Sequence, residues 1–152
     1  MTAVGAAVAP NPLAEGLHDY RVAEPALMVI FGATGDLSGR KLLPALYNLA
    51  KQRLLPAGFA VVGAAIDDLS DDAFRKRASE KISTFSRTQP VDPQVLQSFL
   101  DAVFYVKVDF SKLDDFKTLA RKLDELDHAR HVGGNRVFYC ATPPPTYETI
   151  TE

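Results

Sequence analysis

Three glycines, Gly32, Gly35 and Gly39, are spaced so that the chain between them could cradle a phosphate group. The spacing is a loose match to the G-x-G-x-x-G pattern of dinucleotide-binding turns. Such a turn opens a helix, whose first amides lack partners and whose dipole is positive at that end, and these two properties favour a pyrophosphate. The pattern is weak by itself, so its value depends on the elements around it.

The neighbouring segments supply the structural context that the fingerprint requires. Residues 26–31 are six apolar residues followed by glycine, which is typical of a strand buried on both faces of a parallel sheet. After the turn, Leu42, Leu43, Leu46 and Tyr47 recur at helical spacing. A strand, a glycine turn and a helix therefore follow one another, and we interpret residues 32–39 as a dinucleotide site.

Two other nucleotide-binding turns fit this segment less well. A P-loop needs G-x-x-x-x-G-K-[ST], whereas Gly39-Arg40-Lys41-Leu42 displaces the lysine and lacks the hydroxyl that would hold magnesium. Short-chain reductases and epimerases often begin G-A-T-G-x-x-G, but here the third glycine falls one residue late. That class stays open as an alternative, as does a free-standing nucleotide-binding module.

The rest of the chain alternates between strand-like and helix-like segments. Further elements are expected at residues 59–66 (strand), 70–85 (helix), 93–102 (helix), 104–108 (strand), from 111 (helix) and 136–141 (strand). This alternation predicts an α/β fold, a Rossmann-like doubly wound parallel sheet with strand order 3-2-1-4. Because such folds normally continue to further strands, we expect a longer protein in which the chain is truncated before the substrate domain.

Composition narrows the classes of function. The chain has 152 residues, 47% of them hydrophobic, and a formal net charge of -2, so we expect one globular domain that binds no nucleic acid. No apolar run approaches the ~20 residues that span a membrane. The single cysteine, Cys140, fits a reducing, cytoplasmic setting. Residues 1–25 are rich in alanine, proline and glycine, which predicts a flexible tail before a dinucleotide-binding domain at 26–152.

Four separated segments resemble the N-terminal domain of the glucose-6-phosphate dehydrogenase family. They are residues 32–37, 40–46, 54–56 and 135–144, in matching order and at fitting distances. The resemblance implies the oxidation of glucose 6-phosphate to 6-phosphogluconolactone with hydride transfer to NADP or NAD, the entry step of the pentose phosphate pathway. It also implies a homo-oligomer that assembles through a domain outside this chain.

The resemblance further implies particular site residues. Thr34 would face the adenosine 2′-phosphate, Ala141 and Pro143 would line the nicotinamide side, and Lys41 matches a lysine that reaches the substrate. The complete implied cofactor set is Gly32, Ala33, Thr34, Gly35, Asp36, Leu37, Arg40, Ile66, Asp67, Ala141, Pro143 and Tyr147.

No catalytic residue is assigned within this chain, and no metal site. Oxidising an alcohol needs a base within hydrogen-bond reach of its proton. His18 falls in the expected tail, and His128 and His131 fall in a polar connection that we expect to be solvated. We therefore expect the chain alone to bind cofactor weakly and to catalyse nothing.

Two departures from the family pattern bear on the choice of cofactor. Ser38-Gly39 replaces a segment that commonly carries a lysine, and Ile66, followed by Asp67, replaces a common arginine that holds the 2′-phosphate. An aspartate at this place usually binds a free ribose diol. One such carboxylate charge about 5 Å from a 2′-phosphate would oppose its binding by on the order of 3 kcal/mol, at an effective dielectric near 20.

The sequence leaves two interpretations of this departure open. In the first, NAD is used at least as well as NADP. In the second, Asp67 points to solvent and either Arg40 or Arg75 supplies the missing positive charge for NADP.

Overall fold

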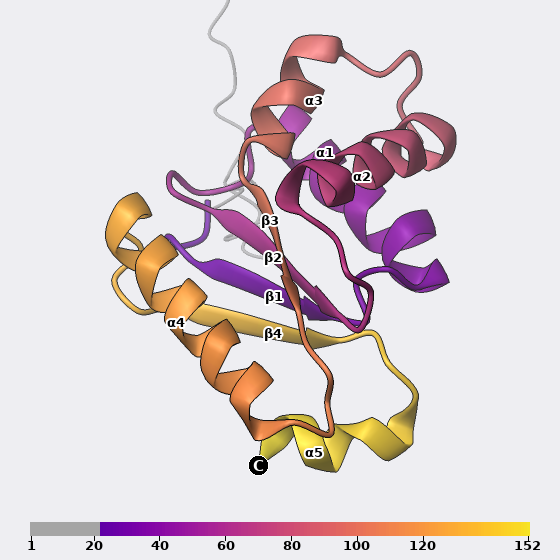
Figure 1. The fold of residues 1–152 in the computed structure, drawn as a ribbon. Coiled ribbons are helices and arrows are strands. Elements are labelled where there is room, and N and C mark those ends of the chain that lie inside the picture. Colours follow the sequence, from indigo (N-terminus) through magenta and orange to yellow (C-terminus); the bar gives the residue numbers. More distant parts are fainter. Residues whose placement is uncertain (1–21) are drawn as a thin grey trace, which may run out of the picture.

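A computed structural model describes residues 22–152 of the chain; residues 1–21, with His18 and most of the expected tail, lie outside the described part. The fold is a parallel sheet between two layers of helices (Figure 1). Its strands are β1 (Leu27–Phe31), β2 (Ala60–Ala65), β3 (Val103–Lys107) and β4 (Arg136–Cys140). Their order, β3-β2-β1-β4, confirms the predicted Rossmann-like topology.

The helices occupy the connections that the sequence pattern indicates. A π-helical turn, Ser38–Leu42, leads into α1 (Leu43–Lys51), and α2 (Asp71–Phe85) and α3 (Pro93–Leu100) separate β2 from β3. After β3 comes α4 (Leu113–Arg130), and a 3₁₀ turn (Pro144–Thr146) and α5 (Tyr147–Thr151) follow β4. No helix between residues 22 and 152 has the length and apolar character needed to cross a bilayer.

Each face of the sheet has its own apolar core. On one face, Ile30, Val61 and Val103 pack with side chains from α1, α2 and α3. On the other, Val29 and Val62 pack with the leucines of α4. Successive side chains along a strand point to opposite faces of the sheet, so neighbouring residues belong to different cores.

The central strand of the sheet is β1, which pairs in parallel with β2 on one side and β4 on the other. Leu27, Val29, Ile30 and Phe31 are all buried. A strand enclosed in this way reads as a continuous apolar run, which is why residues 26–31 predicted it. The glycine turn therefore leaves the sheet from its middle and not from its border.

Several boundaries differ from the sequence-based expectation, for local reasons. Helical structure begins at Asp36, earlier than expected, and the Ser38 hydroxyl donates to the Gly32 carbonyl at 3.1 Å. The α3 helix stops at Leu100 because the Ala102 carbonyl accepts from the Val61 amide of β2 at 2.8 Å. The α4 helix starts two residues later than Ser111, whose hydroxyl is bound to the Asp109 carboxylate at 2.6 Å.

Gly63 lets α2 pack directly on the sheet beside the glycine turn. A β-carbon at this position would lie 2.7 Å from the Phe74 ring and 2.8 Å from the Ala33 β-carbon. Phe74 is buried against β2, and its ring centre is 5.0 Å from that of Tyr105. The absent side chain therefore sets the distance between α2, β2 and the turn.

Tyr105 of β3 anchors the segment that follows β2. Its hydroxyl donates to the carbonyls of Ala65, at 2.9 Å, and Asp67, at 2.6 Å. Burial raises the pKa of Tyr105 to about 12, and the negative charge of Asp67 adds to the rise. The phenol is therefore protonated throughout the physiological range and holds residues 65–67 in place.

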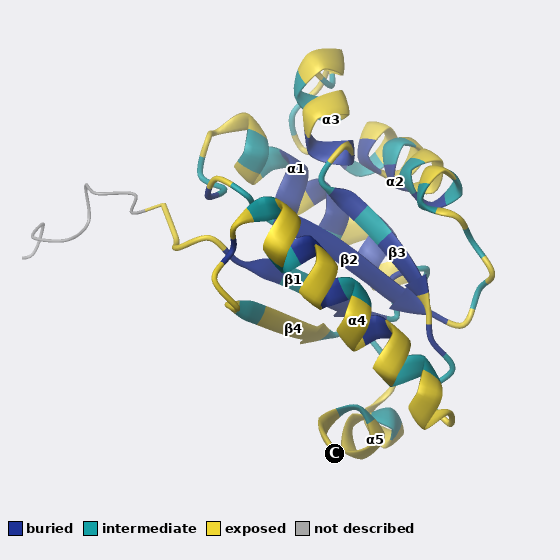
Figure 2. Cartoon of the chain, turned by 60° about the vertical axis from the view of Figure 1, so that its left-hand side comes forward, coloured by how far each residue is buried: buried dark blue, intermediate teal, exposed yellow. Residues whose placement is uncertain are grey.

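One edge of the sheet, β4, is bare on both of its faces. Val137, Phe138 and Tyr139 are exposed by 48%, 55% and 37%, although they form part of a parallel strand (Figure 2). Residues of this type in a doubly wound sheet are normally covered by another strand and by helices. The strand β4 is therefore the most exposed strand of the described sheet.

We predict that Gly63→Ala lowers stability by about 1–3 kcal/mol, because the new methyl group forces Phe74 out of its position. The measurement is the thermal unfolding midpoint of the protein. The matched background is Phe74→Leu, in which the smaller side chain should make the same glycine substitution less costly. An equal cost in both backgrounds would show that the ring contact is not the cause.

A second prediction concerns Tyr105→Phe, which should cost about 1–2 kcal/mol near neutral pH because two hydrogen bonds are lost. The folded state holds the phenolic proton more tightly than the unfolded state, whose pKa is about 10. Unfolding therefore releases this proton between pH 10 and 12, and the stabilisation declines as pH rises through that range.

Thermal unfolding of both forms between pH 8 and 11 measures this effect. The difference in midpoint between wild type and Tyr105→Phe should shrink above pH 10. Tyr139→Phe is the control, because Tyr139 is on the exposed strand β4 and should show no such change. A pH-independent difference for Tyr105→Phe would contradict the assignment.

Candidate functional site

Gly32 ends β1 and turns the chain towards the first helix in a conformation that only glycine adopts readily. Its φ is +80°, and a β-carbon at this position would lie 2.4 Å from the carbonyl oxygen of Ala141. The amide of Ala141 donates in turn to the Phe31 carbonyl at 2.9 Å. The end of β4 thus lies directly against the start of the turn.

The turn is held by internal hydrogen bonds that leave other amides free. The Gly35 amide donates to the Gly32 carbonyl at 3.0 Å, and the Gly39 amide donates to the Gly35 carbonyl at 3.2 Å. Within residues 22–152, no acceptor is bonded to the amides of Thr34, Asp36 or Leu37. Unbonded amides at a helix start are donors that an anion can use.

A cavity of about 400 Å³ lies at the carboxyl ends of the strands, beside this turn. It brings together six of the predicted cofactor residues: Gly32, Thr34, Gly35, Ile66, Ala141 and Pro143. They come from the ends of β1, β2 and β4, which are far apart in sequence. In open α/β sheets this crevice is where ligands bind.

Asp67 follows Ile66, which lines this cavity, and contacts the glycine turn through Thr34. The Thr34 hydroxyl donates to the Asp67 carboxylate at 2.5 Å. The carboxylate is therefore turned towards the site and not towards solvent, contrary to one of the two interpretations of the sequence. Together with the Tyr105 bond to its carbonyl, this contact fixes both the backbone and the side chain of Asp67.

The two arginines considered as sources of positive charge have other partners. Arg40 pairs with Asp36 at 2.7 Å and lies over the Phe85 ring, 5.2 Å from its centre. Arg75 donates to the Val103 carbonyl of β3 at 2.8 Å and lies over the Phe104 ring. Arg75 is thus directed to the outer strand and not to the glycine turn.

The remaining predicted residues do not line the cavity. Ala33 is buried against Gly63, so its side chain supports the turn from below. Leu37 and Lys41 are exposed on the outer side of the first helical turns. Tyr147 begins α5 and is 41% exposed, outside the residues that line this cavity.

The end of β3 contributes residues that the sequence analysis did not select. Val108, Asp109, Phe110 and Ser111 line the same cavity. Hydrogen bonds from the Ser111 hydroxyl and amide hold the pKa of Asp109 below its usual range, so this carboxylate stays ionised. The available signal was their position: polar residues directly after a parallel strand lie at the same edge as the glycine turn.

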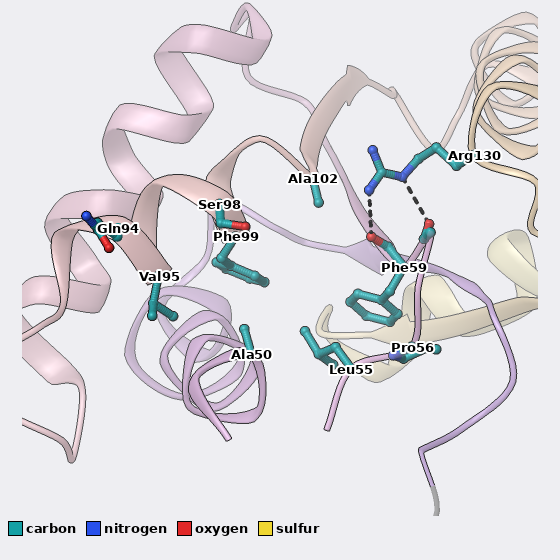
Figure 3. A pocket seen from close by; sticks show the side chains of 11 residues that line it. Ala50, Leu55, Pro56, Phe59, Gln94, Val95, Ser98, Phe99, Ala102 and Arg130 are labelled. Atoms are coloured by element: carbon teal, nitrogen blue, oxygen red, sulfur yellow. Dashed lines mark hydrogen bonds between the residues drawn. The ribbon is translucent and has the colours of Figure 1, made fainter. Parts of the chain in front are cut away.

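A second hollow, of about 400 Å³, lies at the opposite end of the strands, between α1, α3 and the start of β2 (Figure 3). The one charged side chain in its lining, Arg130, donates to the carbonyls of Gly58, at 3.0 Å, and Phe59, at 3.1 Å. Its guanidinium therefore joins the end of α4 to the loop before β2, which is a structural role.

His128 lies in the last turn of α4 and not in a connection, contrary to the expectation from the sequence, because the helix continues to Arg130. His131 directly follows the helix, in the connection that leads into the amino end of β4, and both histidines are exposed. The cavity beside the glycine turn lies at the other end of the sheet. Between residues 22 and 152, no group of three or more His, Cys, Asp or Glu side chains is placed to hold a metal ion.

Comparison with known proteins gives consistent results. The family described as "Glucose-6-phosphate dehydrogenase, NAD binding domain" matches residues 29–152. Glucose-6-phosphate 1-dehydrogenase of Treponema pallidum is 42% identical over 126 residues, which are 83% of this chain and 24% of the relative. Glucose-6-phosphate 1-dehydrogenase 2 of Mycobacterium tuberculosis is 39% identical over 132 residues, 87% of this chain and 26% of the relative.

Solved structures agree. A glucose-6-phosphate dehydrogenase in complex with its substrate glucose 6-phosphate has a TM-score of 0.74 and 28% identity, covering 85% of this chain and 26% of that one. The enzyme from Mycobacterium avium has a TM-score of 0.70 and the same identity, over 83% of this chain and 25% of its own.

The chain thus spans about a quarter of the length of the relatives that it matches. Family, fold and the geometry of the glycine turn all indicate a nicotinamide cofactor. The chain belongs to the NAD-binding domain family of glucose-6-phosphate dehydrogenases.

Proposed function

We propose that the chain is the cofactor-binding part of an enzyme that oxidises glucose 6-phosphate to 6-phosphogluconolactone. The observation that carries the proposal is the set of unbonded amides at Thr34, Asp36 and Leu37, beside a cavity at the middle of a parallel sheet. Membership of the family favours this activity over a short-chain reductase or a free-standing nucleotide-binding module.

The residues present fit a dinucleotide. Gly32 keeps clear the space into which a side chain would project, and the turn presents amides to a pyrophosphate. Ala141 and Pro143 give the far wall of the cavity a small, apolar surface suited to a nicotinamide ring. When bound, the nicotinamide would accept the hydride from the sugar.

This chain's own part in the reaction is to bind and orient. We assign to residues 32–37 the grip on the pyrophosphate, and to Ile66 and Asp67 the contacts with the adenosine ribose. We also assign to Arg40 a positive charge beside the turn, and to Tyr147 a contact with the cofactor from the segment after β4. The base that removes the alcohol proton belongs to the part of the protein outside this chain, as does the surface for homo-oligomer assembly.

We also propose that NAD is used at least as well as NADP. The Asp67 carboxylate is held at the edge of the site by the Thr34 hydroxyl, where it suits a ribose diol and repels a 2′-phosphate. Ile66, 59% exposed at the end of β2, supplies no positive charge to offset this repulsion. We further propose that the protein is cytoplasmic. We also propose that the dinucleotide-binding domain begins at residue 26.

The activity is tested with the full-length protein, and Lys41 provides the specific variant. Lys41→Ala should lower kcat/KM for glucose 6-phosphate by roughly ten- to a hundredfold, the value of a hydrogen bond from a charged donor. The dissociation constants of NAD and NADP should not change. Lys51→Ala, at the exposed end of α1, is the matched control. Failure of the full-length wild type to oxidise glucose 6-phosphate with either cofactor would refute the proposal.

Asp67→Asn tests the cofactor preference, because asparagine keeps the shape and an acceptor for Thr34 but removes the charge. Binding of NADP should tighten by about tenfold, since a half-exposed charge acts below its full Coulomb value. Binding of NAD should weaken several-fold. Titration with both cofactors measures this, with Asp68→Asn as control. A wild-type preference for NADP of a hundredfold or more would reject the NAD proposal.

A further inference from the structure

A second groove adjoins the glycine turn, on the side that faces α2. Its volume is about 350 Å³, and its lining includes Thr34, Gly35 and Gly39 from the turn and Arg77 and Lys81 from α2. Thr34 and Gly35 line this groove and also the cavity at the strand ends. A ligand seated on the turn therefore has access to both spaces.

The groove carries a net positive charge supplied by α2. Arg77 and Lys81 lie one helical turn apart, and the one carboxylate in the lining is Glu80. The stem of Lys81 passes 3.1–3.3 Å from where a β-carbon of Gly39 would lie, and its ammonium lies over the Phe85 ring. Arg77 is exposed and forms no ion pair or hydrogen bond with any residue from 22 to 152.

Arg77 also acts at the end of β2. The Tyr105 hydroxyl, which is bound to the Ala65 and Asp67 carbonyls, feels its charge: Arg77 opposes the rise in the Tyr105 pKa that burial and Asp67 produce. Asp67 and Arg77 place opposite charges near the same Thr34.

We propose that Arg77 is a specificity-determining residue that binds the 2′-phosphate of NADP in the groove beside Thr34. The inference rests on the proposed dinucleotide site. Thr34, which donates to the Asp67 carboxylate, also lines the groove that holds Arg77, where a guanidinium can bind phosphate oxygens through two donors. Asp67 favours NAD and Arg77 retains NADP, so the site accepts both cofactors.

Arg77→Ala in the full-length protein tests this role. The dissociation constant for NADP should rise about tenfold, because a charged hydrogen-bonding partner is removed. The constant for NAD should stay within twofold. The dissociation constant of Arg77→Lys for NADP should fall between those of wild type and Arg77→Ala, because lysine keeps the charge but lacks the paired donors of a guanidinium. Lys76→Ala removes an exposed charge from the same helix outside the groove and should leave both constants unchanged.

Two small ligands that differ in the 2′-phosphate test the contribution of that phosphate to binding. Adenosine 2′,5′-bisphosphate should lose affinity in Arg77→Ala, while AMP should not, and added salt should reduce the difference between wild type and variant. If wild type binds both cofactors and Arg77→Ala leaves their ratio unchanged, the role of Arg77 is refuted and the dinucleotide site stands. If wild type binds neither cofactor, the dinucleotide site fails, and this inference fails with it.

Discussion

The contact between Gly32 and the carbonyl of Ala141 is the constraint on which the site depends. It requires a residue without a side chain at positive φ, and it places the end of β4 against the first residue after β1. Because β1 is the central strand, this contact is made in the middle of the carboxyl edge, where the unbonded amides of the turn and the cavity also lie. The contact between Gly32 and the Ala141 carbonyl therefore shapes both the fold and the candidate site.

Charge is distributed around the turn from elements that are distant in sequence. Asp67 comes from the end of β2, Asp109 from the end of β3 and Arg77 from the second turn of α2. Tyr105 and Thr34 fix the position of Asp67 by hydrogen bonds to its carbonyl and its carboxylate. The sheet thus sets the charges around the glycine turn, while the turn itself presents the unbonded backbone amides.

The sequence predicted the strands, their order and the glycine turn because these depend on local patterns: apolar runs, helical spacing and glycine. Side-chain partners depend on tertiary geometry, which no local pattern encodes. The bond between Thr34 and Asp67 joins residues that are 33 positions apart. Arg77 looked like any exposed helix residue, and only the packing of α2 against the turn, permitted by Gly63, shows that it lines a groove.

The bare strand β4 links the cofactor site to whatever protein surface covers it. Ala141, directly after β4, forms one wall of the cavity, and within the described sheet β4 pairs with β1 alone. Any surface that packs on Val137, Phe138 and Tyr139 will therefore steady that wall. If a surface docks there and a ligand fills the cavity, the two events would be thermodynamically coupled, each strengthening the other.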